Sequence, residues 1–330
     1  MKYKIFEPFT EQTMDYKNQI ADELVPAVEA YNNQPAPPEG MALHAAFRAA
    51  LQQMAQQVSA STTDKLRVEN KYFTNSDGQE IQLRVFTPLT TDTSKPLLYW
   101  MHGGGTMSGL PEQEDSMLFN LAQELDCVIT SVNYRLSPEN PFPKPLNDCY
   151  EGLVHVVNNA SEFGVNGDKV IVGGGSAGGL LSTSVAIKAR NEHGPKILLQ
   201  VLLYPMLDSR CNTNSHKQIT DIGIWDSGMN QYAFQSYLGD LAESEHKKAI
   251  PALMEDLDNL PEAFIAVGTM DCLRDESIAY AQKLAAAGSK VELHVYPGMT
   301  HVFDAIAPNI QAAKDFWEVR SAAIKRAFNQ

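Results

Sequence analysis

A serine lies inside a run of glycines that joins a predicted strand, residues 169–172, to a predicted helix. The run reads Gly173-Gly174-Gly175-Ser176-Ala177-Gly178, and the apolar positions of a helix follow it. Residues 174–178 satisfy GxSxG, in which a serine nucleophile occupies a sharp strand-to-helix turn where bulky neighbours would clash. The start of the helix also favours developing negative charge. These residues predict acyl-transfer chemistry with Ser176 as the nucleophile.

The same glycines fit two other interpretations. Gly173, Gly175 and Gly178 also satisfy GxGxxG, the dinucleotide-binding fingerprint. That fingerprint expects an acidic residue about 20 residues further on, whereas Asp208 lies 30 residues beyond Gly178. The third interpretation is a tight turn that needs glycine for backbone reasons alone. From this segment alone, all three stay open.

A second glycine run favours the nucleophile. An apolar stretch ends in His102-Gly103-Gly104-Gly105, and consecutive glycine N–H groups after a strand can point at an oxyanion. We expect Gly104 and Gly105 to donate to the oxyanion together with Ala177, whose N–H directly follows the nucleophile. Gly103 and His102 are expected to support the loop, with His102 as a structural residue. A dinucleotide-binding fold has no use for this second run.

An acid and a base are expected after the nucleophile. The strand over 263–267 runs through glycine into Asp271, 95 residues beyond Ser176, and His301 lies past the last predicted strand. The imidazole of His301 would reach both Asp271 and Ser176. Asp275 is the less favoured alternative acid, because its position suits the first turn of a helix. The predicted catalytic residues are therefore Ser176, Asp271 and His301.

The other elements must bring these residues to one edge of a sheet. Short apolar strands alternate with helices, which is typical of a mostly parallel sheet covered on both faces. Asn75-Ser76-Asp77-Gly78 is a hairpin signature between the first two strands. The strands are expected over residues 66–73, 81–86, 97–101, 127–134, 169–172, 198–204, 263–267 and 291–296. The helices are expected over residues 14–31, 41–58, 116–125, 146–158, 178–192, 275–287 and 309–328.

Two segments are predicted to cover the carboxyl edge of this sheet. Residues 1–60 read as polar helices, one with a single apolar stripe, and 208–248 contains no predicted strand. Both are expected to form a helical cap over one catalytic domain built from 61–207 and 249–330. The candidate pocket-lining residues are Met107, Ile224, Trp225, Met229, Tyr232 and Phe234. Trp100 is a further candidate by type, but its place in an apolar strand favours ordinary core packing.

Composition narrows the classes of partner. The chain has 330 residues, 44% of them hydrophobic, and a formal net charge of −14. Such a surface repels nucleic acids and anionic membranes, so a small and neutral substrate is favoured over either. No apolar run suggests a leader peptide or a membrane span, and the four scattered cysteines fit a reducing compartment. We therefore expect a cytoplasmic protein without a metal, since no metal-ligand spacing is present.

From about residue 95 to 305 the chain resembles the hormone-sensitive-lipase-like family of α/β-hydrolase carboxylesterases. The order Ser176, Asp271, His301 is the α/β-hydrolase order. The resemblance implies a mostly parallel central sheet flanked by helices under a helical cap, and hydrolysis of carboxylic esters with short to medium acyl chains. It implies no cofactor, and pairing into a homodimer is plausible. The matching segments are 102–105, 134–143, 174–179, 258–261, Gly268, Asp271 and 273–276.

Three positions depart from the family pattern. Gly175 replaces the acidic residue or threonine usual before the nucleophile, Cys272 replaces a proline after the acid, and Val302 replaces a glycine after the histidine. A catalytically silent ligand-binding relative is the alternative function, and a dinucleotide-dependent oxidoreductase is a weaker one. The sequence motifs fit esterase, lactonase and amidase activity equally.

Overall fold

A computed structural model describes residues 16–34, 41–91, 94–222 and 224–330 of the chain. Its centre is an eight-stranded sheet in the order β1-β2-β4-β3-β5-β6-β7-β8. β1 and β2 pair antiparallel, as do β2 and β4, and all later pairs are parallel. The predicted mostly parallel sheet is therefore confirmed. The strands are β1 (Leu66–Thr74), β2 (Glu80–Pro88), β3 (Lys95–Met101), β4 (Val128–Val132), β5 (Val165–Gly175), β6 (Ile197–Leu203), β7 (Glu262–Met270) and β8 (Val291–Thr300).

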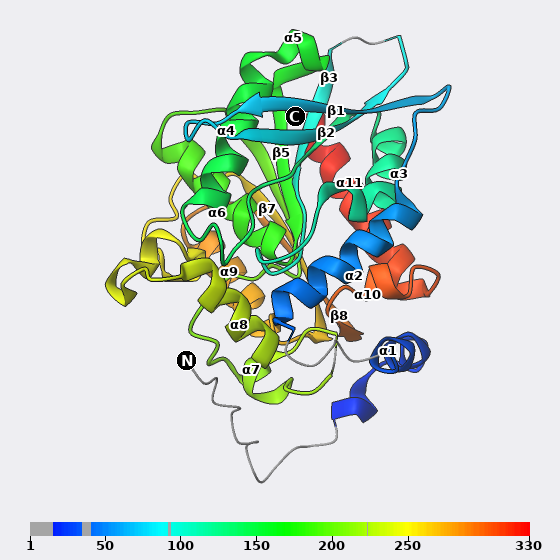
Figure 1. Ribbon diagram of the computed structural model, residues 1–330, viewed down its shortest axis with the longest axis vertical. Coiled ribbons are helices and arrows are strands. Elements are labelled where there is room, and N and C mark those ends of the chain that lie inside the picture. The colour runs from blue at the N-terminus through cyan, green and yellow to red at the C-terminus, as the bar shows by residue number, and fades with distance from the viewer. Residues whose placement is uncertain (1–15, 35–40, 92–93, 223) are drawn as a thin grey trace.

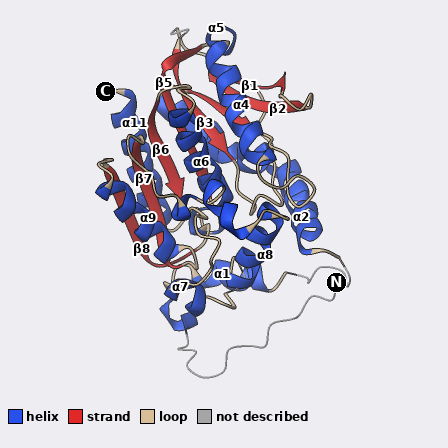
Figure 2. Cartoon of the chain, turned by 90° about the vertical axis from the view of Figure 1, so that its left-hand side faces the viewer, coloured by secondary structure: helices blue, strands red, loops and turns tan. Residues whose placement is uncertain are grey.

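Helices pack on both faces of this sheet (Figures 1 and 2). On one face α3 packs against α11, and on the other α6 packs against α4 and shares a buried apolar cluster with α9. The inner parallel strands, β3 to β7, are largely buried on both sides, which explains their nearly continuous apolar sequences, whereas the edge strand β8 is only partly covered. These helices are α3 (Asp115–Leu125), α4 (Lys144–Asn158), α5 (Ala160–Phe163), α6 (Ala177–Asn191), α9 (Arg274–Ala286), α10 (Phe303–Ile306) and α11 (Gln311–Phe328).

The helix expected over 14–31 is wrong in its extent. Within its described part, the structure has a 3-10 turn, η1 (Tyr16–Gln19), and a separate short helix, α1 (Val25–Asn32). Pro26 explains the break, because proline lacks an N–H and is tolerated only in the first turn of a helix. Residues 14 and 15 lie outside the described residues.

The second N-terminal helix is confirmed as α2 (Leu43–Val58). Its expected apolar stripe is only partly covered, because Met54 stays 41% exposed whereas the neighbouring Ala55 is buried. Within 208–248 the structure forms α7 (Asn214–Gln218), α8 (Ser227–Leu238) and the 3-10 turn η3 (Glu243–Lys248). Figure 1 places α1, α7 and α8 on the side of the molecule away from the β1–β2 hairpin, whereas α2 runs from that side towards β2, where Arg84 donates to the Ala60 carbonyl oxygen just after the helix. The assignment of these segments to a cap stays a prediction.

Candidate active site

The serine occupies the turn between β5 and α6. Ser176 has φ 58° and ψ −119°, a backbone conformation that side-chain-bearing residues rarely adopt. A Cβ atom at Gly174 or Gly178 would overlap the carbonyl oxygen of Met101 on β3. Only glycine therefore allows β3 and the turn to approach this closely, and the turn holds Ser176 at the carboxyl edge of the sheet.

The glycines of the alternative dinucleotide fingerprint face packed protein atoms. A Cβ at Gly173 would lie 2.8 Å from the Trp100 ring, and one at Gly175 would lie 3.1 Å from the Tyr204 ring. Trp100 itself is buried, as expected for a core residue. These glycines serve the packing of the nucleophile turn, and this arrangement does not favour the dinucleotide interpretation.

The three predicted catalytic residues lie within hydrogen-bond distance of one another. His301 Nε2 is 3.0 Å from Ser176 Oγ, and His301 Nδ1 is 2.7 Å from Asp271 Oδ2. The other carboxylate oxygen of Asp271 accepts a bond of 2.9 Å from the N–H of Leu273. Since the carboxylate accepts from Nδ1–H, Nε2 is the nitrogen free to take the serine proton. All three side chains are almost completely buried.

The predicted oxyanion loop has the backbone that only glycine adopts easily. Gly104 and Gly105 have φ values of 118° and 62°. The N–H of Gly103 is occupied, because it donates to Glu114 Oε1 at 3.2 Å. This bond ties Gly103 to Glu114, and the supporting role of Gly103 in the loop stays a prediction. The assignment of Gly104, Gly105 and Ala177 as the oxyanion donors stays a prediction.

His102 is held as a structural residue beneath this loop. Its ring stacks on Tyr134 at a centroid distance of 4.2 Å, and its Nδ1 lies 2.9 Å from the carbonyl oxygen of Gly103. The Tyr134 hydroxyl donates to the His102 carbonyl oxygen at 2.8 Å. Burial lowers the pKa of His102 to about 4. The imidazole is therefore neutral at pH 7 and lies outside the proton-transfer path.

This neutral histidine makes stability depend on pH. Below pH 6.5 the unfolded chain protonates His102 while the folded chain does not, so lowering the pH towards 4 favours unfolding. A pKa lowered from 6.5 to about 4 costs at most about 3 kcal/mol over that window. We expect His102→Asn to show a shallower loss of unfolding free energy than wild type, measured by urea titration at pH 7 and pH 4.5. Parallel losses in the two proteins would contradict this.

A half-buried carboxylate that the sequence did not reveal lies next to the predicted oxyanion loop. Glu114 accepts hydrogen bonds from the Trp100 indole N–H, the Gly103 N–H and the Gln113 side chain. Burial raises the pKa of this carboxyl, although each of these bonds opposes the shift. Its partners come from β3, from the loop and from its own segment, so no sequence spacing identifies it.

Arg48 on α2 is a second residue that sequence reasoning missed. Its guanidinium donates to the carbonyl oxygens of Met107 and Ser137, both at 2.8 Å, and to both oxygens of Glu139. Met107 belongs to the oxyanion loop, since its N–H donates to the carbonyl oxygen of Gly104. The arginine thus fixes α2 to the loop that carries the predicted oxyanion donors.

We expect Arg48→Met to lower kcat by about tenfold with a smaller change in KM, because small misplacements of catalytic groups are costly in rate. The matched control is Arg190→Met, which removes an arginine that bonds to Asp256 and to the carbonyl oxygen of Asp258 away from the triad. Steady-state kinetics of both variants check this. Equal kcat values for the two would show that Arg48 does not position the loop.

The predicted pocket residues differ in their surroundings. Met107, Ile224, Trp225 and Phe234 are buried, and Met229 and Tyr232 are half-buried against the same apolar cluster. Within this set, the Trp225 ring packs on the ring of His301, with 5.9 Å between the two centroids. The Tyr232 hydroxyl lies 2.8 Å from Nδ1 of His44 on α2. The pocket role of the whole set stays a prediction.

One departure from the family pattern, Gly175, has a local explanation. The Tyr204 ring fills the space beside Gly175, contacts the His301 ring edge-on at 4.9 Å, and donates from its hydroxyl to Asp304 Oδ1 at 3.0 Å. Val302 has φ 49° and ψ 30°, the left-handed region that favours glycine. Cys272 is buried, with its sulfur 4.0 Å from the carbonyl oxygen of Trp225. Nothing in the structure explains why it replaces a proline.

The strained valine gives a stability prediction. Val302→Gly is expected to raise the free energy of unfolding by up to about 1 kcal/mol, because a β-branched residue in the left-handed region costs roughly 1–2 kcal/mol and glycine returns part of that as unfolded-chain entropy. Chemical denaturation at pH 7 measures the difference. A clear loss of stability would show that Val302 contributes more through packing than its backbone costs.

The fold and the geometry define a class of protein. A serine on a strand-to-helix turn, a histidine within 3.0 Å and an aspartate behind it form the constellation of a serine hydrolase on an α/β sheet. A family profile described as the α/β hydrolase fold matches residues 97–305. The chain belongs to this α/β-hydrolase family, and its resemblance to hormone-sensitive-lipase-like carboxylesterases is confirmed.

Individual relatives agree with this membership. Carboxylesterase NlhH of Mycobacterium tuberculosis is 32% identical over 268 residues, which span 80% of this chain and 84% of that protein. The arylesterase of Saccharolobus solfataricus is 31% identical over 225 residues, 68% of this chain and 73% of that protein. Among solved structures, esterase LipW from Mycobacterium marinum superposes with a TM-score of 0.86 at 27% identity, covering 95% of this chain and 98% of LipW. A bacterial heroin esterase gives the same TM-score at 30% identity, covering 94% of this chain and 98% of its own.

Proposed function

We propose that the chain hydrolyses small, neutral carboxylic esters with short to medium acyl chains through an acyl-enzyme on Ser176. Relatives such as carboxylesterase NlhH are named as ester hydrolases. Because the chain belongs to the same family, the same activity is assigned to it. The observation that carries the proposal is the hydrogen-bonded line from Asp271 through His301 to Ser176 beside the Gly104–Gly105 loop. A catalytically silent ligand-binding relative would not need the hydrogen bonds between these three side chains.

The proposed mechanism uses only side chains and backbone of this chain. Ser176 Oγ attacks the ester carbonyl carbon while His301 Nε2 takes its proton, and Asp271 stabilises the resulting imidazolium. The N–H groups of Gly104, Gly105 and Ala177 hold the oxyanion, each such donor being worth about 3–4 kcal/mol of barrier. His301 returns the proton to the leaving alcohol. Water then attacks the acyl-enzyme with His301 again acting as the base.

The character of the substrate follows from charge and burial. A net charge of −14 disfavours anionic substrates. The catalytic serine is only 5% exposed, which favours a compact substrate over a lipid aggregate. Among the described residues, no helix combines the length and the apolar character needed to span a membrane. We further propose a cytoplasmic location, supported by four cysteines that are all unpaired. A homodimer, and the absence of nucleic-acid and membrane partners, stay proposals.

The test is a panel of nitrophenyl esters of increasing acyl length combined with covalent labelling. We expect turnover to be greatest among short to medium chains, and an organophosphate to inactivate the protein with one adduct on the peptide that contains Ser176. Mass spectrometry locates the adduct. Absence of turnover on every ester would revive the ligand-binding alternative, whereas an adduct on another serine would overturn the assignment of the nucleophile.

A further inference from the structure

The Trp225 side chain lies between two parts of the catalytic centre. Its ring packs on the His301 ring at 5.9 Å, with an interplanar angle of 29°. On another side its Cη2 atom lies 2.8 Å from where a Cβ of Gly105 would be. Phe47 of α2 contacts the indole as well, at 6.3 Å between centroids. The indole is therefore enclosed by the base, the oxyanion loop and a helix, and is only 6% exposed.

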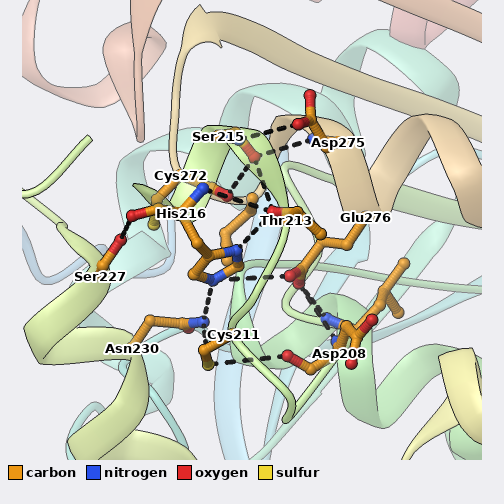
Figure 3. A network of polar contacts seen from close by, with 12 residues as sticks. Asp208, Cys211, Thr213, Ser215, His216, Ser227, Asn230, Cys272, Asp275 and Glu276 are labelled. Atoms are coloured by element: carbon orange, nitrogen blue, oxygen red, sulfur yellow. Dashed lines mark hydrogen bonds and ion pairs between the residues drawn. The ribbon is translucent and has the colours of Figure 1, made fainter. Parts of the chain in front are cut away.

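A chain of hydrogen bonds runs from this indole through Asn230 into a buried polar network around His216, and Figure 3 shows that network from Asn230 onward. The Trp225 Nε1–H donates to Asn230 Oδ1 at 3.3 Å, and Asn230 Nδ2 lies 2.8 Å from His216 Nε2. On the other side of that ring, His216 Nδ1 lies 2.8 Å from Thr213 Oγ1. The network thus links α7, α8 and the loop that carries Trp225.

The donors and acceptors along this chain fit one arrangement. Because the Asn230 oxygen accepts from the indole, its NH₂ group must donate to His216, whose Nε2 is then unprotonated and whose Nδ1–H donates to Thr213. Burial lowers the pKa of His216, which keeps the imidazole neutral as this arrangement requires. Glu276 Oε2 lies 3.7 Å from His216 Nε2, and burial raises the pKa of the Glu276 carboxyl. Each member therefore has one fixed role, so the indole is held in one orientation.

The same network is anchored to the loop of the catalytic acid. Ser215 donates from its hydroxyl to the carbonyl oxygen of Cys272 at 2.7 Å, and Asp275 accepts from the N–H of Ser215 at 2.8 Å. Cys272 directly follows Asp271 in the sequence. Movement of the segment around Trp225 relative to the triad is opposed by these bonds.

We propose that Trp225 is the wall that limits the length of the acyl chain, and that Asn230, fixed by His216, is the positioning residue that holds this wall in place. The inference rests on the proposed ester hydrolysis and names its substrate class: esters of short acids such as acetate to butanoate.

The acyl side is favoured over the alcohol side by the enclosure of the indole. The leaving alcohol departs before water arrives at the same face of His301, so that side of the site needs an open path to solvent. The acyl group, in contrast, stays bound until deacylation and can occupy a closed end. Trp225 is only 6% exposed and lies against Phe47 and Gly105, so the indole suits a side of the site that has no open path to solvent.

Two series of esters test the inference. The first varies the acyl chain from acetate to octanoate with a nitrophenyl leaving group, and the second varies the alcohol from ethyl to octyl with a constant acetyl group. For Trp225→Ala we expect the octanoate-to-acetate ratio of kcat/KM to rise by about tenfold or more, since a pocket that changes by one methylene already discriminates at least that strongly. The alcohol series should keep its wild-type profile. Trp225→Phe should give a smaller rise in the same direction, and it carries the test if the alanine variant does not fold.

Asn230→Ala separates positioning from packing. We expect it to raise the octanoate-to-acetate ratio in the wild-type background and to have no further effect in the Trp225→Ala background. The matched control is Asn75→Ala, which removes another buried asparagine, bonded at 2.7 Å to Asp148 in a network away from the triad. This control should leave the ratio unchanged.

Three outcomes would overturn the inference. An unchanged ratio in folded Trp225 variants would exclude the wall, and a change confined to the alcohol series would exclude its acyl-side placement. An equal effect of Asn230→Ala in both backgrounds would exclude its action through Trp225. Failure of the proposed function is a distinct result, because wild type would then turn over no ester of either series.

Discussion

Ser176→Ala is expected to lower kcat for a nitrophenyl ester by a factor of about 10⁶, the loss typical when a serine nucleophile is removed from an intact constellation. The variant keeps the glycine loop and His301, so a residual rate above that of water is expected from oxyanion stabilisation and binding alone. KM should change much less than kcat, because alanine leaves the walls of the site in place. Steady-state kinetics, corrected for the uncatalysed hydrolysis of the ester, measure both constants.

A matched serine on the same helix controls for this substitution. Ser184 of α6 is buried, and its hydroxyl has no hydrogen-bond partner among the residues that the structure describes. Ser184→Ala should keep wild-type kcat and organophosphate labelling, whereas Ser176→Ala should lose both. Wild-type turnover by a folded Ser176→Ala protein would remove Ser176 as the nucleophile and with it the acyl-enzyme mechanism.

The second large effect is expected for Asp271→Asn, which should lower kcat by about 10⁴. An amide at this position can still accept from the N–H of Leu273 through its oxygen, but it then presents an NH₂ group to His301 Nδ1. The imidazole must respond by placing its proton on Nε2, the nitrogen that faces Ser176. A histidine with that tautomer cannot take the serine proton. The loss should appear in kcat and should persist across the pH range in which wild type is active.

The neighbouring acid is the natural control. Asp275 lies in the first turn of α9, accepts from the N–H of Ser215 and pairs with Arg274. Asp275→Asn should therefore cost less than about tenfold in kcat, through small shifts of the loop at most. Comparable losses for the two variants would mean that the acid is misassigned between these positions.

Sequence order places the three predicted catalytic residues together because each one follows a recognisable strand. Ser176 is framed by glycines that the close approach of β3 requires, and Asp271 and His301 directly follow two neighbouring parallel strands. Parallel strands deliver their carboxyl ends to one edge, so sequence order was sufficient to bring these side chains together. The structural role of His102 was predictable for a related reason: chain order left it no place as the base.

The residues around the triad were not predictable, because their partners are remote in sequence. Arg48 contacts the loop of Met107 across 59 residues, and Tyr204 bonds to Asp304 across 100 residues. The hydrophobic periodicity of the sequence does not indicate such long-range pairs. Pro26, in contrast, is a local indication in the sequence that the helix expected over 14–31 is interrupted near that residue.

The distances along the chain between the parts of the site impose an order on biosynthesis. His301 must reach Ser176 across 125 residues, and just before it the carbonyl oxygen of Gly298 accepts from the N–H of Ala21. As domains form while the chain leaves the ribosome, the serine turn can exist long before its base arrives. The nascent protein therefore carries its nucleophile without a proton acceptor while the next 125 residues are made. It gains the power to cleave esters only when β8 closes the edge of the sheet and captures the early segment around Ala21.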